Sequence, residues 1–299
     1  MDPPAVAFAD HRGGWPGSYD TAASDLGKTF LERHAFFLTG GDIYGYDAAI
    51  GIRRFLLERG LAEPSGGGRM PAIMGTNIYD LDFAHVETVD FVDLGNRACA
   101  AATSKPVAQG SVGAATGATV GPFLEDDPAL VGTKGGLGSS AARAGPWTVG
   151  AIAVANCVGN VVDADAGRTI AGAHRRGSRR FIEMDDLLDA YLRGSRARSG
   201  TTIAVLGTNA PVDHEQLARI VELAHDGIAL AVRPAHMATD GDTILGFTTG
   251  RGRRDRLDWR AVDVLAHVAV REIARSIVRG VRAATSPGGP RGLADPGRR

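Results

Sequence analysis

The chain has 299 residues, 44% of them hydrophobic and 22% charged, and this balance excludes a disordered or fibrous protein. A formal net charge of −1 excludes a global attraction to nucleic acid or anionic lipid. The 41 glycines, with only 6% aromatic residues, favour an α/β protein with many tight turns. Cys99 and Cys157, both in small apolar runs, are predicted to be buried free thiols of a reducing compartment.

The first half of the chain is predicted to alternate short strands with small-residue helices. Its start has no basic or apolar leader, and no apolar run reaches membrane-spanning length, so we expect a cytoplasmic protein without a membrane partner. Apolar runs and glycine punctuation predict the following elements: strands at 5–9 and 34–38, a helix at 43–58, extended segments at 71–74 and 77–83, a helix fragment at 97–103, a glycine run at 110–121 and a strand at 148–155.

The second half is divided by a compositional break over residues 164–200, which holds two arginine-rich runs. These runs are typical of a solvated linker, and without interleaved aromatic residues they do not indicate a nucleic-acid site. The strand at 148–155 is expected to continue at 161–163 after a Gly-Asn turn. Further on, the pattern predicts a strand at 201–207, a helix capped by Asp213 and Gln216 and ended by Gly227, a strand at 244–249, a helix capped by Asp258, and a disordered tail at 285–299.

The junction between Gly200 and Thr201 carries the most specific chemistry in the chain. A basic loop-like stretch runs into the strand that Thr201 opens, so a cut before Thr201 would leave a threonine as a new N-terminus. Such a residue carries a nucleophilic hydroxyl and, in its α-amine, a base. Gly200 favours the cut, because glycine tolerates the strained turn that brings the hydroxyl onto the preceding carbonyl.

Two other patterns predict different chemistry. The loop Gly136–Ala142 resembles the phosphate-binding loop of GHMP small-molecule kinases, although Lys134 precedes its glycines and the companion motifs of that family are not in place. A second group holds two histidines and three aspartates within 18 positions, which raises a metal site, although Asp-Gly-Asp is also an ordinary turn. This group is His225, Asp226, His236, Asp240 and Asp242.

Three further polar residues fit either a structural or a catalytic role. Asn156 ends a buried strand, where its amide either caps a turn or donates into a site as part of an oxyanion hole. Lys134 lies among glycines and Tyr79 ends an apolar run, and each of them also fits either a structural or a catalytic role.

Taken in order, these motifs resemble those of one family. The ordered set is Thr76–Asp80, Gly110–Gly117, Gly132–Gly138, Val154–Asn156 with Gly159–Asp163, Gly200–Ile203 and Asp240–Thr243. It resembles the DmpA-type family of self-processing hydrolases, which includes L-aminopeptidase/D-esterases, β-peptidyl aminopeptidases, a pantetheine hydrolase and nylon-oligomer hydrolases. The resemblance spans about residues 10–283, and six motifs in one order are more specific than any one of them.

The resemblance implies a single αββα four-layer sandwich over residues 1–284, cut into an α-chain, 1–200, and a β-chain, 201–299. Residue by residue, Thr201 matches the nucleophile, Asn156 the oxyanion-hole amide, and Asp240 and Asp242 the groups that position the nucleophile. Lys134 and Tyr79 match further active-site positions. The resemblance also implies hydrolysis of small peptide or amide substrates without a cofactor, in a homo-oligomer, a tetramer or larger, of αβ heterodimers.

The chain departs from the family pattern at three points. Threonine in place of serine, and the Asp-Gly-Asp pair, are similar to the nylon-oligomer branch, and the pantetheine branch shares the threonine. The family normally has further strand-forming sequence ahead of the segment that matches Asp10–Gly14. Either the start is misplaced or a strand of the sandwich is missing, and a catalytically inactive truncated homologue therefore stays an alternative to the hydrolase and the kinase.

Overall fold

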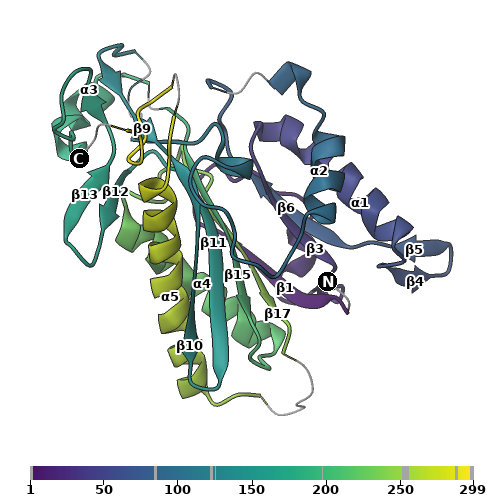
Figure 1. The fold of residues 1–299 in the computed structure, drawn as a ribbon. Coiled ribbons are helices and arrows are strands. Elements are labelled where there is room, and N and C mark those ends of the chain that lie inside the picture. Colours follow the sequence, from purple (N-terminus) through teal and green to yellow (C-terminus); the bar gives the residue numbers. More distant parts are fainter. Residues whose placement is uncertain are drawn as a thin grey trace.

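The architecture is built on a six-stranded sheet (Figure 1). The structure, a computed structural model, describes residues 3–83, 86–121, 124, 126–196, 198–250, 256–286 and 289–296. In order across the sheet, the strands are β10 (Gly136–Ala144), β11 (Trp147–Asn156), β15 (Thr201–Thr208), β17 (Thr243–Thr248), β1 (Ala5–His11) and β2 (Glu32–Arg33). Neighbouring strands are antiparallel except β15 and β17, which run parallel. Their first residues, Thr201 and Thr243, therefore lie at the same end of the sheet.

Two long helices, α4 (His214–Ala231) and α5 (Trp259–Arg282), cover one face of this sheet. As predicted, Asp213 and Gln216 form a reciprocal capping box at the start of α4, and the Asp258 carboxylate accepts from the first turn of α5. Apolar side chains of both helices pack on Ala and Val residues of β11 and β15 and form the largest apolar cluster. Burial of this apolar face stabilises the sheet.

A second, parallel strand pair packs on the opposite face of the sheet. It consists of β3 (Ala35–Thr39) and β6 (Ile73–Asn77), and Met74 of β6 packs with Ala7 and Leu245 of the large sheet. Helices α1 (Ala48–Glu58) and α2 (Phe91–Ala100) lie outside this pair. The layer order is therefore helix, sheet, sheet, helix, which confirms the predicted αββα sandwich.

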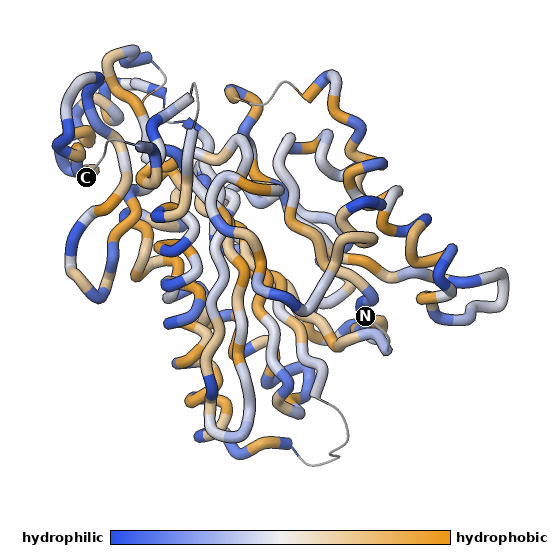
Figure 2. The backbone as a smooth tube through the Cα atoms, viewed as in Figure 1, coloured by the Kyte–Doolittle hydropathy of each residue, from blue (hydrophilic) through white to orange (hydrophobic). Residues whose placement is uncertain are grey.

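The other elements are short and lie outside the four main layers of this sandwich. They are β4 (Glu63–Ser65), β5 (Gly68–Met70), β7 (Thr119–Val120), β8 (Leu130–Val131), β9 (Thr133–Lys134), β12 (Asn160–Asp163), β13 (Arg168–Ala171), β14 (His174–Arg175), β16 (Val232–Arg233), α3 (Leu188–Leu192) and short 3₁₀ turns. Along α1, α2 and α5, apolar residues recur at each turn between polar ones, which is the pattern of a helix with one buried face (Figure 2). Among the described helices, none combines the length and apolar character needed to cross a membrane.

The phosphate loop predicted at Gly136–Ala142 is wrong. These residues lie inside strand β10 rather than at a helix N-terminus, so their amides belong to the sheet. A side chain at Gly138 would lie 2.1 Å from the carbonyl oxygen of Ser276, and one at Gly136 would lie 2.1 Å from that of Gly280. The glycines on this face therefore let helix α5 pack directly on the strand.

Other boundaries differ from the predictions. The helix expected at 43–58 begins as a 3₁₀ turn, Asp42–Asp47, and α4 runs through Gly227 to Ala231. A Cβ at Gly227 would lie 2.3 Å from the carbonyl oxygen of Val270, so this glycine serves the contact between α4 and α5 rather than ending the helix. The segment 161–163 belongs to β12, which pairs with β13 and β16 in a separate sheet and does not extend β11.

Both cysteines are free thiols, as predicted, but only Cys157 is buried, whereas Cys99 is half-exposed. Within the stretch expected to be a disordered tail, residues 287–288 and 297–299 lie outside the described residues. Of the others, Arg291 accepts a hydrogen bond from the amide of Lys134, and the amide of Ala294 donates to Ala284. This part of the chain therefore contacts the body of the sandwich.

Candidate active site

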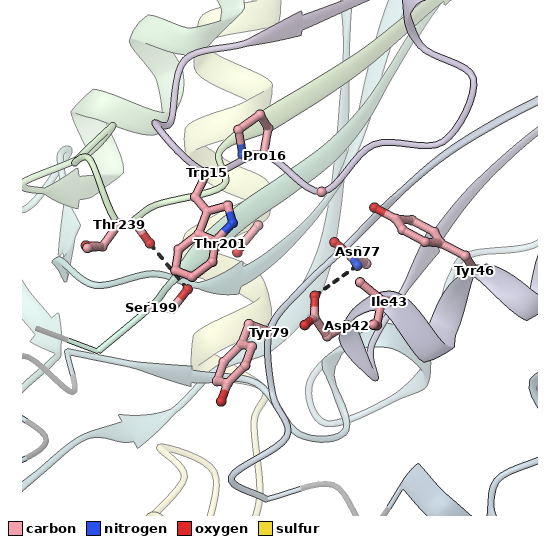
Figure 3. A pocket seen from close by; sticks show the side chains of 11 residues that line it. Trp15, Pro16, Asp42, Ile43, Tyr46, Asn77, Tyr79, Ser199, Thr201 and Thr239 are labelled. Atoms are coloured by element: carbon pink, nitrogen blue, oxygen red, sulfur yellow. Dashed lines mark hydrogen bonds between the residues drawn. The ribbon is translucent and has the colours of Figure 1, made fainter.

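A cavity of about 420 Å³ opens where the two sheets meet at the start of β15 (Figure 3). It is lined by Trp15, Pro16, Gly17, Asp42, Ile43, Tyr46, Asn77, Tyr79, Ser199, Thr201 and Thr239. Of the residues predicted for the site, Thr201 and Tyr79 line this cavity. A volume in this range suits a small-molecule substrate rather than a folded protein.

The peptide bond between Gly200 and Thr201 is held from both sides. Thr201 is only 4% exposed, and its Oγ1 lies 2.5 Å from the carbonyl oxygen of Gly200, to which the hydroxyl donates. The backbone amide of Gly241 donates to the same oxygen at 2.9 Å, while the Gly200 amide donates to the Thr239 carbonyl at 3.2 Å. The hydroxyl of Thr201 is thus adjacent to a carbonyl that a second donor polarises.

The Asp-Gly-Asp turn lies directly beneath this peptide bond, and both carboxylates are completely buried. Asp240 accepts from the amides of Val158 at 3.3 Å and Met237 at 2.9 Å. Asp242 accepts from the amide of Thr202 at 2.6 Å, so it fixes the residue that follows the predicted nucleophile. Burial, and secondarily the charge of Asp242, raise the pKa of Asp240 to about 7.

His236 is a member of this site that sequence reasoning assigned only to a metal group. Its Nδ1 donates to Oδ2 of Asp242 at 2.8 Å and its amide donates to the same oxygen at 3.0 Å. This carboxylate raises the pKa of the His236 imidazole despite the opposing effect of burial. His236 therefore fixes one oxygen of Asp242, while the amide of Thr202 fixes the other.

No group of three or more histidine, cysteine, aspartate or glutamate side chains within the described ranges is arranged to hold a metal ion. His225 packs edge-on against His236 and approaches the backbone oxygen of Asp10 at 3.2 Å. Burial lowers its pKa to about 4, so this histidine is neutral near pH 7. Of the predicted histidine and aspartate group, His236 and Asp242 are hydrogen-bonded to each other, whereas Asp226 is exposed on helix α4.

Asn156 stands directly opposite Thr201 in the antiparallel pairing of β11 with β15. Its side chain is 3% exposed, with Oδ1 accepting from the Thr119 amide at 2.9 Å and Nδ2 donating to the Tyr79 carbonyl at 2.8 Å. Both ends of the amide are therefore fixed, and the Asn156 side chain links the end of strand β11 to Thr119 and to the loop that carries Tyr79.

Lys134 is buried behind this layer and does not line the cavity. Its Nζ donates to the carbonyls of Ala115 at 2.7 Å, Ala118 at 2.8 Å and Gly135 at 3.3 Å. Burial lowers the pKa of Lys134 to about 8, while the nearby Asp80 carboxylate opposes that shift. In this arrangement the ammonium group holds together the glycine-rich segment that supports Asn156.

The six predicted site residues thus fall into two shells. Thr201 and Tyr79 face the cavity, whereas Asn156, Asp240, Asp242 and Lys134 are buried around them. The sequence did not point to the amide of Gly241 or to the cavity-lining Asp42.

Comparison with known proteins agrees with this geometry. The family model of peptidase family S58 matches residues 1–294. An uncharacterised aminopeptidase of Mycobacterium leprae is 33% identical over 272 residues, which cover 83% of this chain and 68% of that protein. An uncharacterised aminopeptidase of Mycobacterium tuberculosis is 36% identical over 257 residues, 83% of this chain and 71% of the relative.

A more distant relative is the 6-aminohexanoate-oligomer endohydrolase of Paenarthrobacter ureafaciens, 28% identical over 220 residues, which cover 72% of this chain and 60% of that protein. Among solved structures, a β-aminopeptidase of Burkholderia sp. superposes with a TM-score of 0.67 at 21% identity over 99% of this chain and 80% of the other. The L-aminopeptidase D-Ala-esterase/amidase of Ochrobactrum anthropi, a variant of the Ntn hydrolase fold, gives 0.66 at 19% identity over 98% and 78%. The chain therefore belongs to peptidase family S58, and it is a hydrolase.

Proposed function

We propose that the chain is a self-processing hydrolase of amide bonds whose nucleophile, Thr201, is freed by cleavage between Gly200 and Thr201. The observation that carries this proposal is the packing of the Thr201 hydroxyl against a carbonyl that also accepts from the Gly241 amide. A donor already in place on the scissile oxygen stabilises the negative charge that develops there when the carbon is attacked.

Self-cleavage would follow from this arrangement in two steps. Oγ1 of Thr201 attacks the carbonyl carbon of Gly200, the C–N bond breaks, and the nitrogen takes up a proton to become the α-amine of Thr201. The resulting ester between Gly200 and Oγ1 is then hydrolysed by water, which leaves a carboxylate on Gly200 and a free hydroxyl on Thr201. The Asp240 carboxyl, with a pKa raised to about 7, holds or accepts a proton near neutral pH and lies against Gly200.

In turnover, the freed α-amine of Thr201 acts as the base, since α-amines have pKa values of about 7.7–8.0. Oγ1 attacks the amide carbon of a substrate, the amine leaves with a proton, and water releases the acyl group. We assign Asn156 to the oxyanion of this reaction and Tyr79 to the wall against which the substrate lies. Asp242 holds the backbone that follows Thr201, Asp240 holds the amides of Val158 and Met237 beside Gly200, and Lys134 supports Asn156.

The names of the relatives indicate the class of substrate. Both mycobacterial relatives are described as aminopeptidases and the more distant one as an oligomer endohydrolase. We therefore propose small peptides or peptide-like amides as substrates of this chain, which fits a cavity of about 420 Å³.

Mass spectrometry of purified protein tests this function. We expect two chains, 1–200 and 201–299, and a Thr201→Ala variant that stays full-length and hydrolyses no amide. Thr201→Ser is the matched variant that keeps a hydroxyl, and it should still be cut. An intact wild-type chain, or a cut only after an arginine such as Arg198, would overturn the proposal and favour an inactive relative.

A further inference from the structure

Among the described residues that line the cavity with Thr201, Asp42 is the single charged one. It begins the 3₁₀ turn Asp42–Asp47, which follows strand β3 on the wall formed by the second sheet. In Figure 3 its carboxylate lies beside Asn77 on the side of the cavity across from Thr201 and Ser199. A substrate that reaches Thr201 therefore contacts a wall that carries one negative charge.

The carboxylate of Asp42 has polar neighbours but, within the described residues, no cationic partner. Asn77 Nδ2 donates to its Oδ1 at 3.2 Å, and no lysine or arginine of the described part of the chain forms an ion pair with it. Burial raises the pKa of the Asp42 carboxyl, and it also raises that of Tyr46, beside it, to about 12. Tyr46 thus stays a neutral phenol, and the carboxylate loses hydration without gaining an opposite charge.

The backbone at Asp42 also shows that its position is specific. Its φ of 49° lies in the left-handed region, which is uncommon for a residue other than glycine and is reached most easily by aspartate and asparagine. Its amide donates to the carbonyl of Ile78 at 3.1 Å, which fixes the turn against the strand that ends at Asn77. The carboxylate is therefore held in the cavity rather than free to turn into solvent.

We infer that Asp42 binds the protonated amine of the substrate and so selects small amides that carry a free amino group near the scissile bond. An ammonium group would supply the missing positive charge and donate to a carboxylate that Asn77 already orients. This inference rests on the proposed function, because it needs Thr201 to be the nucleophile at the other side of the cavity.

The experiment compares p-nitroanilides of L-alanine, β-alanine and 6-aminohexanoic acid with their N-acetyl derivatives. For the compound hydrolysed fastest, we expect wild-type protein to show kcat/KM about 10- to 100-fold higher with the free amine than with the acetylated one. Asp42→Asn should remove most of this preference by raising KM for the free amine, because asparagine keeps the shape and accepts the left-handed backbone but carries no charge. Asp47→Asn, an exposed change at the end of the same turn, is the matched control and should keep the preference.

Each other outcome is informative. Cleavage into two chains, monitored by mass spectrometry in every variant, separates this inference from the proposed function. If a processed wild-type enzyme hydrolyses acetylated compounds as well as free amines, or hydrolyses no free amine, the inference is wrong although the processing is real. If Asp42→Asn slows both kinds of compound equally, Asp42 acts on the α-amine of Thr201 instead of the substrate, and the inference is again overturned.

Discussion

A Gly200→Ala substitution should slow self-cleavage without removing any of the reacting groups. A Cβ at Gly200 would lie 2.4 Å from the amide nitrogen of Val158 and 2.9 Å from Oδ1 of Asp240, against an ordinary contact distance of about 3.4 Å. The Val158 nitrogen is a backbone atom and cannot rotate out of the way as a side chain can, so residue 200 has to move by about 1 Å. The carbonyl of residue 200 moves with it and leaves its place beside the Thr201 hydroxyl.

The size of the effect follows from this displacement. A misplacement of about 1 Å between reacting groups costs about 100-fold in rate. Overpacking at a buried site also destabilises the fold by about 1–3 kcal/mol, and each kcal/mol lowers the melting temperature of a chain of this size by about 2–4 °C. We therefore expect a folded precursor that is cut about 100-fold more slowly than the wild-type chain.

The assay follows the loss of full-length chain by mass spectrometry after rapid purification, with a thermal melt of the same sample. Gly66→Ala is the control, because a side chain at Gly66 meets nothing within 4 Å. If Gly200→Ala melts cooperatively within a few degrees of wild type and is still cut at the wild-type rate, the packed carbonyl is not what limits self-cleavage.

Three other changes test the residues packed beneath the proposed nucleophile. His236→Asn keeps a donor and suits the left-handed backbone there, but it removes the titratable imidazole that donates to Asp242, so we expect about 10-fold slower cleavage and a pH profile displaced from that of wild type. Lys134→Met takes the donor from three buried carbonyls and should lower the free energy of unfolding by about 3 kcal/mol in urea titrations. The folded state raises the pKa of Asp240 from 3.8 to about 7, so the uncut Thr201→Ala chain should lose stability as pH rises through that window. Melting temperatures at pH 5 and pH 8 should differ less when Asp240→Asn is added, and an undiminished difference would refute this assignment.

The sandwich was predicted from the ordered set of motifs that resembles the DmpA-type family, whereas single elements and the proposed cleavage junction were predicted from local patterns. Strand β15 follows from its own apolar run, the cap of α4 from Asp213 and Gln216, and the predicted nucleophile from its place after a glycine. The same local logic failed where tertiary packing decides the role of a glycine. The local sequence predicts that Gly227 ends the helix, yet Gly227 lies inside α4. A glycine is needed there because helix α5 passes too close for any side chain.

The electrostatics of the site could not be predicted from the sequence for the same reason. His236 lies in a loop and Asp42 begins a 3₁₀ turn, and neither belongs to a sequence motif, so the role of each depends on the residues that the fold places beside it. His236 meets Asp242 because the Asp-Gly-Asp turn folds back under β15, and Asp42 meets the cavity because β3 and β6 run parallel on the facing sheet. The proposed nucleophile is thus recognisable in one strand, whereas the charge that would select its substrate comes from the opposite layer of the sandwich.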